Sequence, residues 1–561
     1  MSGTVKYLIL ASCFAVLAVS FLIGLWARRK VTSPEAFFGG AKIFGPLTIG
    51  LATMAAVGSA FAVVGVPGLV YSTGNAILLF MFAAPAFVFG YLVIGKKVRA
   101  LAEIGSVASL GDLSDLRFNG HRGIKLLLSV MLFLGCAMYL SAQVEACAKL
   151  FENLFDWNEV VIAVVIFAIL IAYTVLSGEI GGVLTQAFQG LVIVVAGFIF
   201  TASFFIVTGG FGPVLEVIAS TESSLDPSAL TAWGSLPGAF SFAWVLLPAL
   251  GIMCQPQVLT RMTMLRTPRE LPKLSLYAVI TNMITGLMVM AIGYCAIYLV
   301  ATGRVAIEHP DTAVFRVADY LGILAQLFVY PAVLAAALST SSLFLSLAGN
   351  IMSRDLPGSL GISISPVRQV LVSRIAMSVM GVAAIGFAAL SGDMVAILGT
   401  YGFGTLAAAT FPIFVIGLLW KSASSQGVML GMLTALVATL GGISIEMLKR
   451  FGLSTFEWPG SVPWYVFVLA ASVIVTIAAS LLSRARDGDR LDRRVDELRR
   501  HDVVGGQGGD PLFIHLDTGA RPVEGKGDHP VIRHPPRGQD DIAFPVAGAG
   551  REVAGQGETG Q

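Results

Sequence analysis

The stretch LAAALSTSSLFLSLAGNIMSR, residues 334–354, indicates both the fold class and a first functional hypothesis. It is apolar enough to lie in a bilayer, yet it carries many hydroxyl groups and one amide. Residues three or four positions apart lie on one face of a helix, and five polar side chains follow that spacing: Ser339, Ser342, Ser346, Asn350 and Ser353. Such a polar stripe faces other helices or a water-filled cavity rather than lipid. It therefore predicts either an oxygen-lined path with a cation site or contacts in which Ser and Thr hold neighbouring helices together.

The composition supports a membrane location for this stretch. Hydrophobic residues make up 56% of the 561 residues, and charged residues only 12%, against about 25% in soluble proteins. We therefore expect an all-α, polytopic membrane protein. About 13 apolar segments are long enough to cross a bilayer as helices, at approximately 7–26, 46–71, 75–95, 125–150, 158–177, 183–208, 237–259, 275–301, 326–352, 366–389, 393–420, 427–447 and 462–483.

The distribution of Lys and Arg predicts the orientation. With the N-terminus outside, the inner loops hold 18 of these residues and the outer side holds 6. Positive residues concentrate on the cytoplasmic side, so we expect an external N-terminus and a cytoplasmic C-terminus in the plasma membrane, or cell inner membrane. After residue 483 the chain becomes charged and then rich in Gly, Pro, Asp and Arg, which predicts a mostly disordered cytoplasmic tail at 484–561.

Two of the predicted spans are interrupted by glycine and proline. The 46–71 span carries Gly58-Ser59 near its middle and a GVPG segment at 65–68, and the 237–259 span carries Pro248 and Gln255-Pro256. Gly and Pro weaken the helical hydrogen-bond ladder and free backbone carbonyls. If the extra helix at 1–30 is set aside, the interrupted spans are the first and sixth of ten. This arrangement is typical of inverted-repeat transporters, whose ligands bind at the breaks. It predicts a ten-helix transport core at 45–420, followed by two further helices at 427–483.

Few ionisable groups lie within the predicted spans. Glu145, with Gln143 nearby, could bind a cation, carry a proton or contact a solute, or it could simply be wetted at the outer end and paired with Lys149. Gln186 could supply an amide oxygen. The chain has no nucleophile–base set, phosphate loop or HExxH motif. We therefore expect no enzyme activity and no cofactor, with an ion gradient as the energy source.

Six local motifs, in order along the chain, resemble the sodium:solute symporter family, which includes proline, pantothenate, monocarboxylate and sodium–glucose transporters. The QPQVLTR and LST segments look closest to the proline-permease branch, and Gln186 is similar to monocarboxylate members. The resemblance covers about residues 5–483. The motifs are GVPGLVYSTG (65–74), MYLSAQVEACAKLFENLF (138–155), SGEIGGVLTQAFQG (177–190), GIMCQPQVLTRM (251–262), LSTSSLFLSLAGNIMSRDL (338–356) and GLLWKSASSQGVMLGM (417–432).

The resemblance implies a LeuT-like fold, with five plus five helices in an inverted repeat, one helix before it and two after. It also implies a sodium site between helices 1 and 8 of the core. Carried over by motif, its ligands are three backbone carbonyls and two hydroxyls, on Ala55, Gly58, Ala336, Ser339 and Thr340. The solute is expected beside this site, near Val57, Ser59 and Ala60. Facing helices contribute Gln143, Trp244, Pro248, Tyr401 and Phe403 as further candidates.

The chain departs from the family pattern at two positions. Many members carry an acidic or amide residue where this chain has Val57, and many carry Asp where it has Gln186. The loss of these groups weakens the expectation of a second sodium and of sodium affinity in general, and it leaves coupling to protons through Glu145 open. Val57 also makes the solute pocket apolar at that point, which favours a small organic solute over a sugar.

Taken together, these observations predict a secondary active symporter in the membrane. Its expected partners are the lipid bilayer, sodium and a small organic solute such as a monocarboxylate, amino acid or related organic acid, with no nucleic acid and no other metal. The alternatives are a proton-coupled transporter of the same fold and a transporter-like membrane sensor that signals through its tail.

Overall fold

The computed structural model describes residues 3–29, 37–39, 42–75, 86, 88–105, 107–155, 159–220, 227–231, 233–239, 242–243, 250–391 and 394–483. Within these ranges every regular element is a helix, and the β-pairing is confined to one isolated bridge between Phe44 and Leu265. Nine of the helices described are long and apolar enough to cross a membrane, and one bent pair makes a tenth span. The prediction of an all-helical, multi-pass membrane protein is therefore confirmed.

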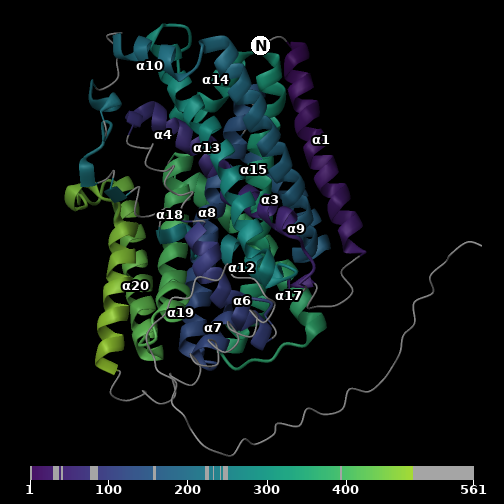
Figure 1. Ribbon diagram of the computed structural model, residues 1–561, viewed down its shortest axis with the longest axis vertical. Helices are drawn as coiled ribbons and strands as arrows, with labels where there is room; N and C mark the ends of the chain where they lie inside the picture. Colours follow the sequence, from purple (N-terminus) through teal and green to yellow (C-terminus); the bar gives the residue numbers. More distant parts are fainter. Residues whose placement is uncertain are drawn as a thin grey trace, which may run out of the picture. The chain divides into compact units, whose positions relative to one another are not determined.

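The helices run along the chain from α1 at the N-terminus to a last helix that ends at Ser483 (Figure 1). The first half contains α1 (Gly3–Arg28), α3 (Pro46–Val57), α4 (Val66–Thr73), α6 (Gly95–Ile104), α7 (Leu110–Phe118), α8 (Arg122–Phe155), α9 (Glu159–Thr208) and α10 (Phe211–Ser220). The second contains α12 (Pro256–Met264), α13 (Leu271–Ala301), α14 (Ala313–Leu321), α15 (Ile323–Asn350), α16 (Leu356–Ser359), α17 (Pro366–Ser391), α18 (Val395–Thr410), α19 (Gly417–Leu419), α20 (Ser425–Arg450) and the last helix, Trp464–Ser483. Within the described ranges, four π-helical turns adjoin these helices: η1 (Phe61–Gly65), η3 (Gly90–Ile94), η7 (Ile351–Asp355) and η8 (Phe411–Ile416).

The predicted spans at 158–177 and 183–208 correspond to α9. Its backbone leaves helical geometry at Gly178, where φ is 57° and ψ is −156°. A positive φ of this kind suits glycine because it has no Cβ. Much of the predicted 75–95 and 237–259 spans, with Trp244 and Pro248, and all of the 484–561 tail lie outside the described residues.

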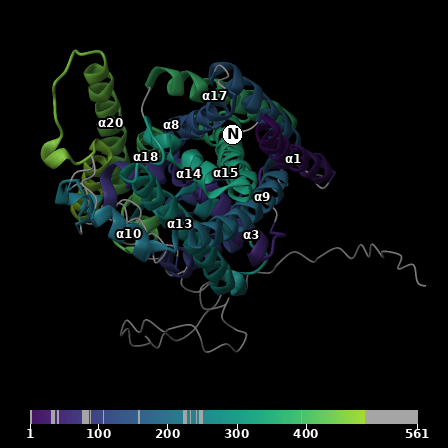
Figure 2. The same ribbon diagram turned by 90° about the horizontal axis from the view of Figure 1, so that it is seen from above.

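Helix α15 lies inside the helical bundle. It packs against α1, α3, α8, α9 and α17, and α1 and α20 lie at opposite edges when the bundle is viewed from above (Figure 2). Residues 329–350 of α15 are all buried. The polar stripe from Ser339 to Asn350 therefore faces other helices and not lipid.

The break predicted at Gly58-Ser59 is present. Helix α3 ends at Val57, Gly58 closes it by donating its N–H to the carbonyl of Met54 across 2.6 Å, and the two halves of the span differ in direction by 55°. The second half begins when the carbonyl of Ser59 accepts the N–H groups of Ala62 and Val63. The break leaves backbone groups near the middle of the bundle without helical partners, so they are free to bind side chains or ligands.

The second interruption precedes α12. Gln255 has extended backbone angles at the N-cap of this helix, and Pro256 occupies its first turn, where the missing N–H costs nothing. The prediction of a helix boundary at Gln255-Pro256 is therefore confirmed.

Candidate cation and solute site

Hydroxyl groups of α15 meet backbone carbonyls at the end of α3. The hydroxyl of Ser339 donates to the carbonyl of Ala55 at 2.7 Å and to that of Ala336, on its own helix, at 2.9 Å. The hydroxyl of Thr340 donates to the carbonyl of Ala56 at 3.1 Å. Both hydroxyl side chains are fully buried. The fold thus brings together four of the five residues predicted for the cation site: Ala55, Ala336, Ser339 and Thr340.

The last carbonyls of a helix have no helical partners, and the helix dipole makes this end negative. This explains why Ala56, which sequence comparison by motif omitted, offers its oxygen beside Ala55. Gly58 lies at the break, where its N–H caps α3. The donor set is made of neutral hard oxygens, which is the chemistry that a small monovalent cation requires. A bound cation would take the carbonyl lone pairs that the two hydroxyl protons now occupy, and the hydroxyls would rotate to offer their oxygens.

A second set of polar contacts lies just beyond the break. The N–H of Ala60 donates to Oε1 of Gln143 at 3.0 Å, and the hydroxyls of Ser59 and Tyr139 are 3.0 Å apart. Gln143 in turn donates through Nε2 to the carbonyl of Tyr139 at 3.3 Å. Helix α8 therefore satisfies the first backbone N–H of the second half-helix, a position where anionic groups bind in proteins.

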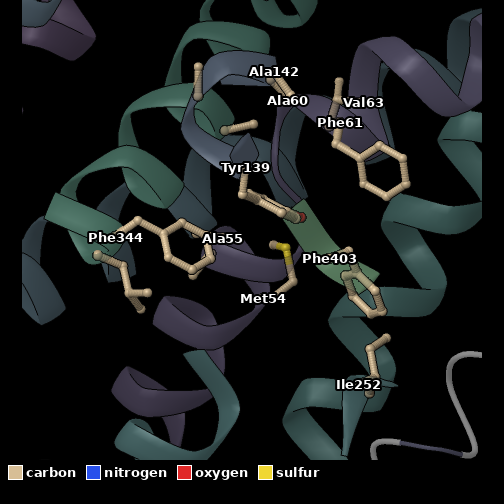
Figure 3. Close-up of a cluster of buried hydrophobic side chains, with 14 of the residues drawn as sticks. Met54, Ala55, Ala60, Phe61, Val63, Tyr139, Ala142, Ile252, Phe344 and Phe403 are labelled. Carbon is tan, nitrogen blue, oxygen red and sulfur yellow. The ribbon is translucent and has the colours of Figure 1, made fainter. Parts of the chain in front are cut away.

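Apolar and aromatic side chains surround these contacts. Figure 3 shows Tyr139 between Phe344 and Phe61, with Met54, Ile252 and Phe403 below. The ring of Tyr139 lies 4.9 Å from that of Phe344 and 6.4 Å from that of Phe61. Gln255 approaches the same region and donates to the carbonyl of Phe403 at 2.9 Å. The resulting site combines a few fixed polar groups with an aromatic lining, as small-molecule sites usually do.

Three of the predicted solute or coupling residues lie elsewhere or outside the described part of the chain. Tyr401 packs against Trp464 and Tyr465, at ring distances of 5.6 and 6.3 Å, and so faces the last helix. Trp244 is outside the described residues. Glu145 lies 3.8 Å from Lys149, one turn further along α8, which matches the simpler of the two interpretations of its sequence.

Gln186 lies beside the polar stripe of α15. It donates through Nε2 to the hydroxyl of Ser342 at 3.0 Å and accepts from Arg261 at 2.6 Å. Arg261 is fully buried and also pairs with Glu179. From the sequence, Arg261 follows the predicted 237–259 span and is one of the 18 Lys and Arg residues counted in inner loops, and Glu179 was not singled out. Nothing in the local pattern shows that α12 directs this guanidinium into the bundle.

On the face of the bundle that carries α14, a turn of the chain binds the start of α18. Asp311 accepts the N–H of Val395 at 2.9 Å, and burial raises the pKa of Asp311 to about 6. The same turn touches α4, since a Cβ on Gly68 would lie 2.8 Å from the carbonyl oxygen of Pro310. This turn therefore contacts both α4, in the second half of the broken helix, and α18.

Comparison with known proteins agrees with this architecture. The model of the sodium:solute symporter family matches residues 37–435. Sodium/proline symporter 2 of Staphylococcus saprophyticus is 24% identical over 506 residues, covering 88% of this chain and 96% of the relative. The sodium/proline symporter of Staphylococcus aureus is 25% identical over 511 residues, covering 89% and 96%.

Among solved structures, the fold is similar to that of a Na⁺-coupled sialic acid symporter in a substrate-bound, outward-open state. The TM-score is 0.66 at 19% identity, and the match covers 85% of this chain and 97% of that one. This likeness concerns the fold, whereas the family model covers well over half of the sequence. The chain therefore belongs to the sodium:solute symporter family.

Proposed function

We propose that the chain imports a small organic solute together with sodium, and that sodium binds between α3 and α15. The main support for this proposal is the contact of the Ser339 and Thr340 hydroxyls with the carbonyls of Ala55 and Ala56, where α3 ends at the helix break. Family membership makes sodium-coupled symport the function class, and a neutral oxygen cage at the negative end of a half-helix suits a sodium ion.

The two ligands are coupled through the broken helix. Sodium at Ala55 and Ala56 fixes the end of α3, and three to five residues later the same backbone places Ser59 and Ala60 beside the solute. Ordering this segment first lowers the cost of ordering it for the second ligand, so each ligand raises the affinity for the other. The loaded carrier then alternates between outward-open and inward-open states.

The solute is an amino acid such as proline, a monocarboxylate or a related organic acid. Support comes from the aromatic lining of Phe61, Tyr139 and Phe403 and from the hydroxyls of Ser59 and Tyr139 at the break, which can donate hydrogen bonds to a carboxylate. The printed names of the curated relatives, sodium/proline symporters, favour the same class.

The proposed architecture has 13 transmembrane helices. Ten of them, at 45–420, form two inverted five-helix halves with α3 to α4 and the segment ending in α12 as the broken helices. One helix precedes this core, and two follow it at 427–483. The protein lies in the plasma membrane. Its N-terminus is outside the cell and its tail at 484–561 is in the cytoplasm, an orientation favoured by the distribution of Lys and Arg.

The first experiment measures the melting temperature of the purified full-length protein in detergent, with sodium against choline at fixed ionic strength. A ligand that binds the folded state raises the melting temperature. We expect a rise that is specific to sodium and absent in the Ser339→Ala/Thr340→Ala variant, followed by a further rise with L-proline or a short monocarboxylate. An equal sodium response in the double variant would contradict the site.

The same protein in liposomes separates the alternatives. Solute uptake driven by an inward sodium gradient supports symport. Uptake driven only by a pH gradient would replace sodium by the proton. Binding without uptake, lost when the tail after residue 500 is removed, would indicate the sensor.

A further inference from the structure

A buried guanidinium lies behind the polar stripe of α15. Arg261, on α12, is fully buried and contacts Glu179 at 2.5 Å and Oε1 of Gln186 at 2.6 Å. Glu179 and Gln186 are seven residues apart on α9, so they lie two turns apart on one face of that helix. The ion pair neutralises the charge of Arg261, which keeps a buried arginine tolerable.

Arg261 determines which way round the amide of Gln186 is held. A guanidinium is a donor only, so the group that faces it must be the amide oxygen of Gln186. The amide nitrogen is then forced toward α15, where it lies 3.0 Å from the hydroxyl of Ser342. The hydroxyl proton of Ser342 points in turn to the carbonyl of Ser339, at 3.0 Å. All of these hydrogen bonds run in one direction, from Arg261 to the residue that supplies the candidate cation site.

The polar stripe consequently has different chemistry at two neighbouring positions. At Ser339 and Thr340 the partners are carbonyl oxygens, which can accept a cation. At Ser342 the partner is an N–H₂ group with partial positive charge, backed by a guanidinium. A cation is repelled there, although the serine spacing along the helix is the same.

We propose that Gln186 and Arg261 are positioning residues that prevent a cation from binding at Ser342. They thereby confine cation binding to one ion at Ser339 and Thr340. The proposal rests on the proposed sodium site and adds its stoichiometry, one cation per transport cycle. It also links the cation site to α12, the helix that follows the second interruption, through Ser342, Gln186 and Arg261. Loss of the Gln186 amide leaves Arg261 free to turn toward the Ser342 oxygen, which brings its positive charge closer to the bound ion.

The test titrates sodium against the melting temperature of the full-length protein and against the rate of sodium-driven uptake. Variants are made at Gln186 because replacing Arg261 would leave Glu179 buried without its partner. Gln186→Leu removes the hydrogen bonds to Ser342 and Arg261 and keeps a side chain of similar size. Gln189→Leu is the matched control, since Gln189 is on the same helix, is fully buried and donates to a serine, Ser20 of α1, at 3.0 Å.

We expect the wild type to titrate with a Hill slope near one. In Gln186→Leu the half-saturating sodium concentration rises about fivefold, the usual effect of one hydrogen bond, while it stays unchanged in Gln189→Leu. Gln186→Glu places an acceptor with negative charge opposite Ser342, and it is expected to lower the half-saturating sodium concentration below that of the wild type.

Several results would overturn the inference while leaving the proposed function intact. One is a wild-type slope clearly above one that falls to one in Gln186→Leu, because the amide would then help to bind a second ion. Others are equal changes in the Gln186 and Gln189 variants, no change in either, or weaker sodium binding in Gln186→Glu. If the wild type shows no response to sodium at all, the proposed function fails and this inference fails with it.

Discussion

Ser339 and Ala55 are 284 positions apart in the sequence, yet the hydroxyl of the first donates to the carbonyl of the second across 2.7 Å. The contact exists because α3 stops two residues later, at Val57, and leaves its last carbonyls unpaired. A continuous helix would have used these oxygens internally. The same glycine that ends the helix therefore creates the acceptors of the candidate site.

The hydroxyl of Thr340 is expected to matter more than its methyl group. Thr340→Val keeps the shape of the side chain and loses the oxygen, whereas Thr340→Ser keeps the oxygen. We expect Thr340→Val to raise the half-saturating sodium concentration for uptake about tenfold, by the loss of one ion ligand, and Thr340→Ser to change it little. Sodium-dependent uptake measured in proteoliposomes checks this, and similar values for the two variants would contradict a ligand role.

A substitution of Gln143 is expected to weaken the binding of the solute more than the binding of the cation. Gln143→Leu leaves the buried N–H of Ala60 without its acceptor, which costs about 1–3 kcal/mol, whereas Gln143→Glu keeps an acceptor there. We expect the leucine variant to be less stable and to have weaker solute binding, with the sodium-induced rise in melting temperature retained. Loss of the sodium response with unchanged solute affinity would reverse the assignment of the two subsites.

Much of this fold could be predicted from the sequence because its signals are local. The length of the apolar runs predicted the spans, and Gly58-Ser59 and Gln255-Pro256 predicted two helix ends that the structure contains. The polar spacing on α15 predicted that the stripe would not face lipid, and residues 329–350 are indeed all buried. Each of these features depends only on one helix and on whether its faces contact lipid or protein. The periodicity of polar and apolar residues indicates such features directly.

The composition of the candidate site could be predicted only in part, since its contacts join distant helices. The stripe residue Ser342 was identified, but its partner Arg261 was assigned to a loop, and Tyr139 was not singled out although it precedes Gln143 by one helical turn. Tyr401 was chosen by its position on a facing helix, and the structure turns it toward Trp464 instead. Which way a side chain points within a bundle depends on how each helix is rotated about its axis, and that rotation is fixed by packing, not by local sequence.

Close packing between α8 and α18 is expected to make Gly402 intolerant of any side chain. A Cβ at this position would lie 2.5 Å from the backbone nitrogen of Tyr139, so neither atom can move without separating the helices. We expect Gly402→Ala to destabilise the protein by about 1–3 kcal/mol and to reduce uptake. Gly441→Ala on α20 is the control, because nothing lies within 4 Å of its Cβ and alanine favours a helix there. A melting temperature that falls equally in both variants would contradict the packing argument.

The last prediction concerns the carboxylate of Asp311, which caps α18 from a turn 84 residues earlier. Burial raises its pKa from 3.8 to about 6, although the Val395 N–H and the positive groups that face it, Lys149 on α8 and His309 in the same turn, act in the opposite direction. A raised pKa means that the folded state binds the proton more tightly than the unfolded chain does. The unfavourable contribution of Asp311 is therefore complete above the folded pKa and is relieved as the pH falls from about 6 toward 3.8.

Asp311→Asn keeps an oxygen for the Val395 N–H and removes the charge. At pH 7.5 we expect it to increase the free energy of unfolding by up to about 2–3 kcal/mol and to raise the melting temperature accordingly. At pH 5 we expect the difference from the wild type to be roughly halved, because the wild-type carboxylate is then mostly protonated. Glu308→Gln, which removes an exposed carboxylate three residues earlier, is expected to change neither value. The measurement is thermal unfolding of the three proteins between pH 7.5 and pH 5. A difference between Asp311→Asn and the wild type that is constant over this range would mean that Asp311 does not take up a proton when the turn binds α18.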